Sequence, residues 1–138
     1  MAVGNKFNAT VANLANGLFN LGADTLKVML TNTAPVAANS VYADLVDLAT
    51  ANGYTAGGVS LSLTSSAQSG GLYKYIASVA NPTWTFSGAV TFRYVAVYDN
   101  AGTKPLLGWW DFGSGITTAN GDTFAVVFDA VNGIYQLT

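Results

Sequence analysis

The chain has 138 residues, of which 51% are hydrophobic and only 9% are charged, and its formal net charge is −2. Its basic residues are scattered singly, so no patch could neutralise a row of phosphates, and we expect no nucleic-acid partner. Cysteine is absent, which removes disulfides and thiolate metal sites.

Charged residues are scarce beside the roughly 25% of a typical soluble protein. A free-standing monomer normally uses surface charge to stay dispersed, so this composition favours a protein that works inside an assembly over a secreted β-protein. No apolar run approaches the ~20 residues that cross a bilayer. Residues 1–6 lack a basic region followed by an apolar core, so we expect neither a membrane partner nor a signal peptide.

Groups for acid–base chemistry are few, because the chain contains no histidine, cysteine or glutamate. Asp99 and Asp111 flank one predicted hairpin and could form a glycosidase pair, but both lie where Asp commonly makes local hydrogen bonds. Asp122 and Asp129 could suit calcium, yet no loop has dense carboxylate spacing, and we interpret them as turn residues. We predict no enzymatic activity, no metal site and no cofactor.

The N-terminal part predicts an amphipathic helix over residues 5–21, with a helical segment or arm spanning 1–22. It either covers one face or end of a sheet, or orders only against a neighbouring subunit. Leu26–Thr31 alternates as a half-buried strand. Val41–Thr50 predicts a short second helix that ends at the turn formed by Asn52-Gly53.

The remainder of the chain predicts β-strands separated by turns. The central feature is a long hairpin of Val90–Tyr98 and Leu106–Phe112, whose first strand is apolar on both faces and is expected in the middle of a sheet. The other predicted strands are Val59–Ser65, Leu72–Val79, Thr83–Phe86, Ser114–Ala119, Thr123–Asp129 and Ile134–Thr138. We predict one mainly β domain over 1–138, an antiparallel β-sandwich of jelly-roll-like type.

Aromatic residues provide the candidate contact sites. Trp109 and Trp110 are adjacent in a predicted strand and must point to opposite faces, so one can anchor the core while the other needs a second layer, a partner or water. Exposed aromatics can stack on sugars, but buried aromatics more often anchor core and interfaces. We expect Phe7, Trp84, Trp109 and Trp110 to make subunit contacts.

Four stretches resemble a family of small structural proteins of tailed bacteriophages. They are LKVMLTNTAP at 26–35, NGYTAGG at 52–58, PLLGWWDFGS at 105–114 and NGDTF at 120–124. The resemblance runs from the first helix to the C-terminus.

The size is similar to that of capsid decoration (cement) proteins. The resemblance therefore implies a virion protein on the capsid surface, a homo-oligomer, most simply a trimer, that binds the major capsid protein and bridges its subunits. Two alternatives stay open, a tail, baseplate or fibre-tip component and a carbohydrate-binding β-sandwich module.

Overall fold

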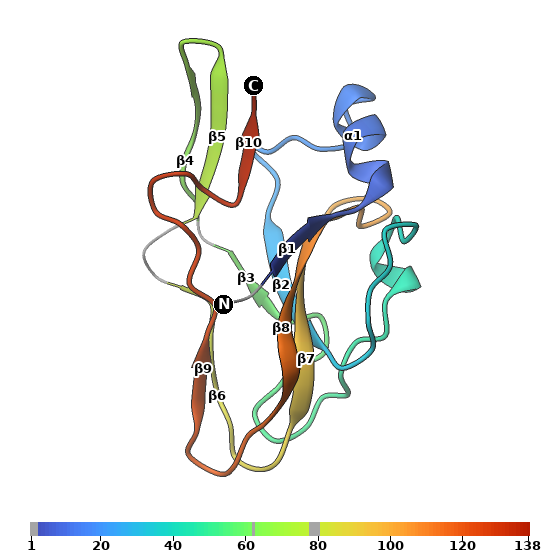
Figure 1. Ribbon diagram of the computed structural model, residues 1–138, viewed down its shortest axis with the longest axis vertical. Coiled ribbons are helices and arrows are strands. Elements are labelled where there is room, and N and C mark those ends of the chain that lie inside the picture. Colours follow the sequence, from blue (N-terminus) through green and yellow to red (C-terminus); the bar gives the residue numbers. More distant parts are fainter. Residues whose placement is uncertain (1–2, 62, 78–80) are drawn as a thin grey trace.

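The computed structural model describes residues 3–61, 63–77 and 81–138. Its first layer is a five-stranded antiparallel sheet in the order β1-β8-β7-β2-β3 (Figure 1). The strands of this sheet are β1 (Val3–Lys6), β2 (Leu26–Thr31), β3 (Val59–Ser60), β7 (Thr91–Asp99) and β8 (Leu106–Thr117).

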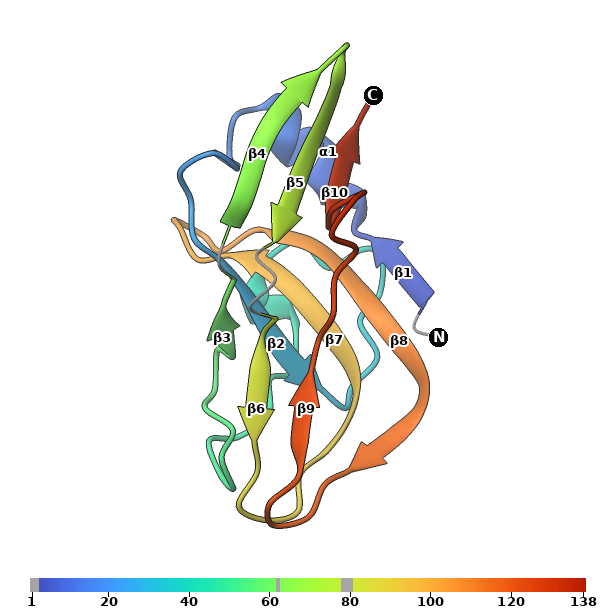
Figure 2. The ribbon, with the colours of Figure 1, turned by 90° about the vertical axis from the view of Figure 1, so that its left-hand side faces the viewer.

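The second layer holds a three-stranded sheet in the order β10-β5-β4 and a two-stranded pair, β6-β9. Its strands are β4 (Leu63–Ser69), β5 (Leu72–Ala77), β6 (Thr83–Thr85), β9 (Thr123–Ala125) and β10 (Tyr135–Leu137). The segment that carries β5 and β6 pairs at two places with the segment that carries β9 and β10. β5 pairs with β10, and β6 pairs with β9. Figure 2 shows β6 and β9 in front of the five-stranded sheet and β4, β5 and β10 above it. The predicted mainly β fold of antiparallel sheets is confirmed, in a sandwich-like arrangement.

The predicted central hairpin is the centre of the first layer. β7 pairs with β2 on one side and β8 on the other, and its apolar residues are buried on both faces as expected. β8 continues through Thr117, although the sequence predicted a break near Gly113. The register between β7 and β8 shifts there, because Phe92 pairs with Ile116 whereas Tyr94 pairs with Asp111, which leaves extra residues in β8. The extra residues bulge out, and Gly113 takes a φ of +86° that favours glycine.

The predicted helix over residues 5–21 is wrong at both ends. Residues Val3–Lys6 form β1, which pairs with β8, and the helix α1 covers only Asn8–Ala15. Its N-cap residue is Phe7, without a side-chain hydrogen bond, and Gly17 follows the helix with a φ of +72°. Asparagines and a glycine are poor helix formers, so the helix extends only as far as packing supports it.

The second predicted helix, Val41–Thr50, is also wrong. Only a 3-10 turn, η1 (Tyr42–Asp44), forms there, and Leu45 is already extended. The Asp44 carboxylate accepts hydrogen bonds from the backbone N–H groups of Ser40 and Val41 and closes the turn locally. The periodic apolar pattern of this segment therefore reflects its packing on the sheet rather than a helix.

Some strand boundaries also differ from the prediction. The predicted strand Val59–Ser65 is two strands, because β3 pairs with β2 in one layer and β4 pairs with β5 in the other. The end of the predicted strand Leu72–Val79 lies outside the described residues. The C-terminal segment pairs as a strand, as expected.

Both faces of the five-stranded sheet are covered. Between the layers lies a large cluster that includes Val95, Val97 and Phe92, with Trp110 packed at its margin. On the opposite face a smaller cluster includes Phe7, Tyr98 and Trp109. The predicted opposite orientation of Trp109 and Trp110 is confirmed. Trp110 packs against the cluster between the layers, and Trp109 packs in the cluster on the opposite face.

Candidate docking surface

Three of the four predicted contact residues are core residues of this chain. Phe7 is fully buried, and its ring centroid lies 4.5 Å from that of Trp109, which is 9% exposed. Trp84 is 3% exposed and packs between Tyr54 and Phe124. These side chains are used within the protomer, so the expected docking role for Phe7, Trp84 and Trp109 is corrected to a core role.

Trp110 is the half-buried member of the predicted set. β1 pairs with β8 so that Gly4 lies opposite Trp110. A Cβ at Gly4 would come within 2.9 Å of the indole Nε1, so glycine is what allows the ring to lie across β1. The ring also meets Phe128 edge to face, with centroids 5.4 Å apart. Trp110 is therefore held in place from two sides.

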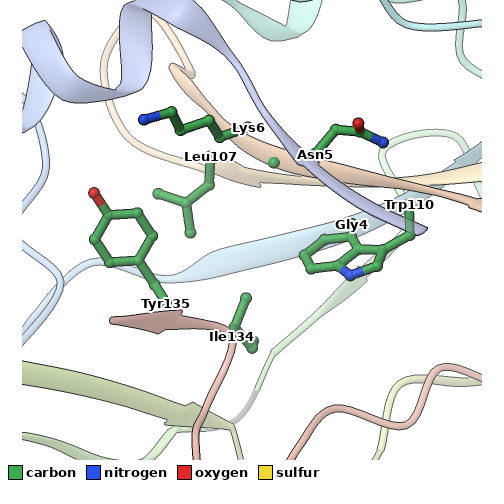
Figure 3. Close-up of a pocket in the computed structure, with 8 residues that line it drawn as sticks. Gly4, Asn5, Lys6, Leu107, Trp110, Ile134 and Tyr135 are labelled. Atoms are coloured by element: carbon green, nitrogen blue, oxygen red, sulfur yellow. The ribbon is translucent and has the colours of Figure 1, made fainter. Parts of the chain in front are cut away.

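A hollow of about 400 Å³ opens beside Trp110, between the β1–β8 edge of one layer and β10 of the other (Figure 3). Its lining combines the indole, the Tyr135 phenol, the apolar side chains of Leu107 and Ile134, and β1 residues. The complete lining is Gly4, Asn5, Lys6, Leu107, Gly108, Trp110, Ile134 and Tyr135. This size and mixture are typical of sites that receive a small ligand or an anchoring side chain.

A second hollow, of about 430 Å³, lies on the other side of Tyr135. Helix α1 and the loop after it form one wall, and β5 and β10 form the other. Its lining is Leu14, Gly17, Phe19, Asn20, Leu21, Tyr73, Tyr135 and Leu137. Tyr135 lines both hollows, and burial raises the pKa of its phenol, so the group stays a neutral hydrogen-bond donor at physiological pH.

Leu137 lines the second hollow, and Leu18 lies in the chain between two of its lining residues, Gly17 and Phe19. Leu18 follows α1 and Leu137 ends β10, and each is 47% exposed. We call the two hollows together with these two leucines the β10 surface. It combines exposed aliphatic groups, a tyrosine and a tryptophan, which is the composition of an interface core.

The sequence reasoning missed the residues of this surface other than Trp110. Tyr135 and Leu137 were predicted only as part of a terminal strand. Their alternation was visible, but the α1 wall that turns them into a hollow comes from tertiary packing.

The carboxylates that could have formed a glycosidase pair are separated. Asp111 pairs with Tyr94 in the sheet, whereas Asp99 lies five residues further along β7, about 16 Å at the rise of a strand. Glycosidase carboxylates lie about 5–10 Å apart. Asp111 instead accepts two hydrogen bonds from the Arg93 guanidinium, which lower the pKa of its carboxyl. This ion pair is a local feature of the sheet.

The two calcium candidates act as turn residues, as predicted. Asp122 accepts a hydrogen bond from the backbone N–H of Ala119, and Asp129 accepts them from those of Val131 and Asn132. These hydrogen bonds lower the pKa of Asp129. Within the described part of the chain, no group of three or more acidic side chains is placed to hold a metal ion.

In comparisons with known proteins, no family model, no curated protein and no solved structure matches this chain. Over the residues that the structure describes, no helix has the length and apolar character to cross a membrane.

Proposed function

We propose that this protein is a structural component of a tailed-phage virion, a decoration protein that binds the outer capsid shell and bridges its subunits. The observation that carries the proposal is the β10 surface, where two apolar-lined hollows adjoin on a chain with only 9% charged residues. A surface of this kind suits a permanent contact with another protein. The resemblance of the sequence to phage structural proteins supplies the biological setting.

In this proposal the major capsid protein covers the β10 surface. Leu18, Leu137 and the Tyr135 ring become buried in the complex, with Trp110 as a preorganised anchor. Because the contact exists only when shell subunits are assembled, binding shifts the equilibrium toward the intact shell by mass action. The protein itself forms a closed symmetric oligomer, most simply a trimer.

The proposal is tested by mixing the purified protein with expanded empty heads and, separately, with tails, and sedimenting each. The expected result is a fixed stoichiometry in the head pellet and none in the tail pellet, with a mass by light scattering that is a multiple of three protomers. Protein that pellets with tails supports a tail or baseplate component instead. Protein that stays in the supernatant in both mixtures overturns the virion role.

A second candidate function, sugar binding, is favoured by one observation. The hollow in Figure 3 places the Trp110 indole and the Tyr135 phenol around a space of about 400 Å³, with Lys6 at its margin. Aromatic rings and polar groups around such a space can hold one or two sugar units. Selective binding on a glycan array that Y135A abolishes supports this candidate, and an array without binding removes it.

A further inference from the structure

Strand β4 has an unpaired outer edge. It lies at the end of the order β10-β5-β4, so β5 pairs with one side only. Among the described residues, no backbone hydrogen bond reaches its other side. In both ribbon views the β4–β5 hairpin extends away from the body of the molecule (Figure 1 and Figure 2). The outer backbone N–H and C=O groups of β4 are therefore available to another strand.

The other edge strands of the described chain are short. β3 has two residues, β6, β9 and β10 have three each, and β1 has four and ends at Lys6. β4 has seven residues, LTSSAQS, with neither a charge nor a proline. Proteins normally protect edge strands with charged side chains, prolines or short length. Along β4 these devices are missing, apart from one register shift near Leu63.

We propose that β4 pairs with β4 of a second copy of this chain, antiparallel about a twofold axis at Ser66. The strand matches itself in this register. Ser66 lies opposite the partner's Ser66, Ser65 opposite the partner's Ala67, and no like charges face each other. Small side chains let the two strands approach closely. The result is a continuous six-stranded sheet, β10-β5-β4 followed by its twofold mate. Together with the proposed trimer, this twofold contact joins two trimers into a closed hexamer.

A second copy fits this edge better than a charged partner segment does. β4 itself carries no charge, with Ser65 and Ala67 on one face and Ser66 on the other. The charge on the neighbouring strand is Lys74 of β5, which pairs with Ala67 and donates a hydrogen bond to the Val131 carbonyl. The Ser66 hydroxyl contacts the Tyr73 hydroxyl within the sheet, so its polar group is already satisfied. The groups of β4 that still require partners are the backbone N–H and C=O groups of its outer edge, and an identical strand supplies acceptors and donors for them.

This contact goes beyond the proposed shell role and does not depend on it. It uses β4, whereas shell binding uses the β10 surface, so the two can fail separately. A protein that self-pairs through β4 and binds no head leaves this inference intact.

The first test uses the absence of native cysteines, comparing S66C with S69C as single-cysteine variants of the full chain. In the twofold register the two Cα atoms at position 66 lie about 4.5–5.5 Å apart, within disulfide range. The two at position 69 are offset by six residues, about 20 Å. Ser69 is more exposed than Ser66, so random collision favours S69C. We expect covalent dimers to form faster from S66C under a mild oxidant. Faster or equal dimer formation by S69C overturns the proposal.

A second test does not depend on S66C folding. In the variant S65E/A67E, the carboxylate introduced at position 65 lies opposite the one introduced at position 67 of the other copy, and this variant is expected to weaken self-association. S65K/A67E places an ammonium opposite that carboxylate instead and is expected to retain self-association. T83E/T85E on β6 adds the same charge as S65E/A67E and is the control expected to behave as wild type. Light scattering over a concentration series measures all three, with circular dichroism to confirm folding. Equal mass for S65E/A67E and S65K/A67E contradicts strand pairing in this register.

Discussion

The two faces of the five-stranded sheet are covered in different ways. Between the layers, β-strands bring large apolar side chains together, and the rings of Phe92 and Phe124 meet edge to face with centroids 4.7 Å apart. The opposite face is covered by an irregular segment that includes η1. In this segment the Asp47 carboxylate accepts hydrogen bonds from the hydroxyl of Tyr42, which packs on this face, and from the backbone N–H of Gly57. It also accepts one from the hydroxyl of Tyr54, whose ring lies in the cluster between the layers.

The two covering layers satisfy their backbone hydrogen-bonding groups in different ways. Strands satisfy their own backbone groups by pairing, so the layer they form needs only apolar burial. An irregular segment pairs few of its backbone groups, and here the Asp47 carboxylate accepts from donors spread along the segment. One of these donors, the Tyr54 hydroxyl, also accepts a hydrogen bond from the backbone N–H of Leu30 in β2. Burial and the Asp47 carboxylate raise the pKa values of the Tyr42 and Tyr54 phenols, so both remain protonated donors. The first face depends on packed volume, and the second depends on a polar centre.

The largest expected effect follows from emptying the apolar face. Phe92→Ala removes a fully buried ring that contacts Phe86 and Phe124, and we expect the free energy of unfolding to fall by about 3–5 kcal/mol. Urea unfolding measures this change. Phe92→Leu, which fills most of the volume, is the control and is expected to cost much less. A loss below about 1 kcal/mol for Phe92→Ala contradicts the volume-dependent description of this face.

A smaller and more local effect is expected at the polar centre. Asp47→Ala leaves the buried Tyr54 hydroxyl and the Gly57 N–H without their acceptor, and we expect a loss of about 2–3 kcal/mol. Hydrogen exchange should show faster exchange in residues 42–58 while β7 stays protected. Asp44→Ala is the matched control, because Asp44 is exposed and closes only the turn. Equal effects of the two substitutions contradict a special role for Asp47.

The end of β7 offers a contrast to Asp47. Asp99 is fully buried, yet its Oδ1 accepts a hydrogen bond from Ala101 N–H while Oδ2 has no geometrically defined hydrogen-bond partner among the described residues. Burial first, and then the neighbouring Asp24 carboxyl, raise the pKa of Asp99 to about 7 from its ordinary value of 3.8. Asp99, which has few donors, therefore keeps its proton up to a pH of about 7, whereas Asp47 accepts hydrogen bonds from several donors.

A pH dependence follows from this raised pKa. Between about pH 4 and pH 7 the folded protein keeps the Asp99 proton that the unfolded chain releases, so stability falls as the pH rises through this window and stays lower above it. Asp99→Asn is neutral at all these pH values. We expect it to flatten the decline and to have a higher thermal midpoint than wild type at pH 8. A decline of unchanged size in the variant contradicts the assignment to Asp99.

Local sequence patterns correctly predicted several strands of the five-stranded sheet. Leu26–Thr31 forms β2 with the predicted bounds, and the turn residues between Tyr98 and Leu106 correctly marked the central hairpin. The prediction that this strand is half-buried is wrong, because Met29 and Thr31 are fully buried on the opposite face of the sheet. β1 was missed because Val3–Lys6 has no strand pattern of its own and becomes a strand only by pairing with β8. The segment 41–50 was mistaken for a helix because apolar spacing cannot show that only a 3-10 turn forms and that the chain is extended from Leu45.

The candidate site was harder to predict for the same reason. The aromatic candidates were selected by residue type, but Trp84 and Trp109 are buried, whereas Trp110 borders an open hollow. Leu18 and Leu137 are far apart in sequence, and ordinary leucines carry no local sign of exposure. Leu137 lines the second hollow, and Leu18 lies between Gly17 and Phe19, which line the same hollow. This arrangement of the loop after α1 beside β10 is tertiary, and no short-range pattern contains it.

The most direct test of the central claim asks whether the β10 surface docks onto the shell. The variant L18D/L137D places two carboxylates on this surface, and V36D/V46D places two at valines that are similarly exposed in the segment covering the opposite face of the sheet. Binding to expanded heads is measured by sedimentation over a concentration series. We predict that L18D/L137D binds at least about tenfold more weakly than wild type, while V36D/V46D binds as wild type does. Equal weakening by both variants, or full binding by L18D/L137D, contradicts the account.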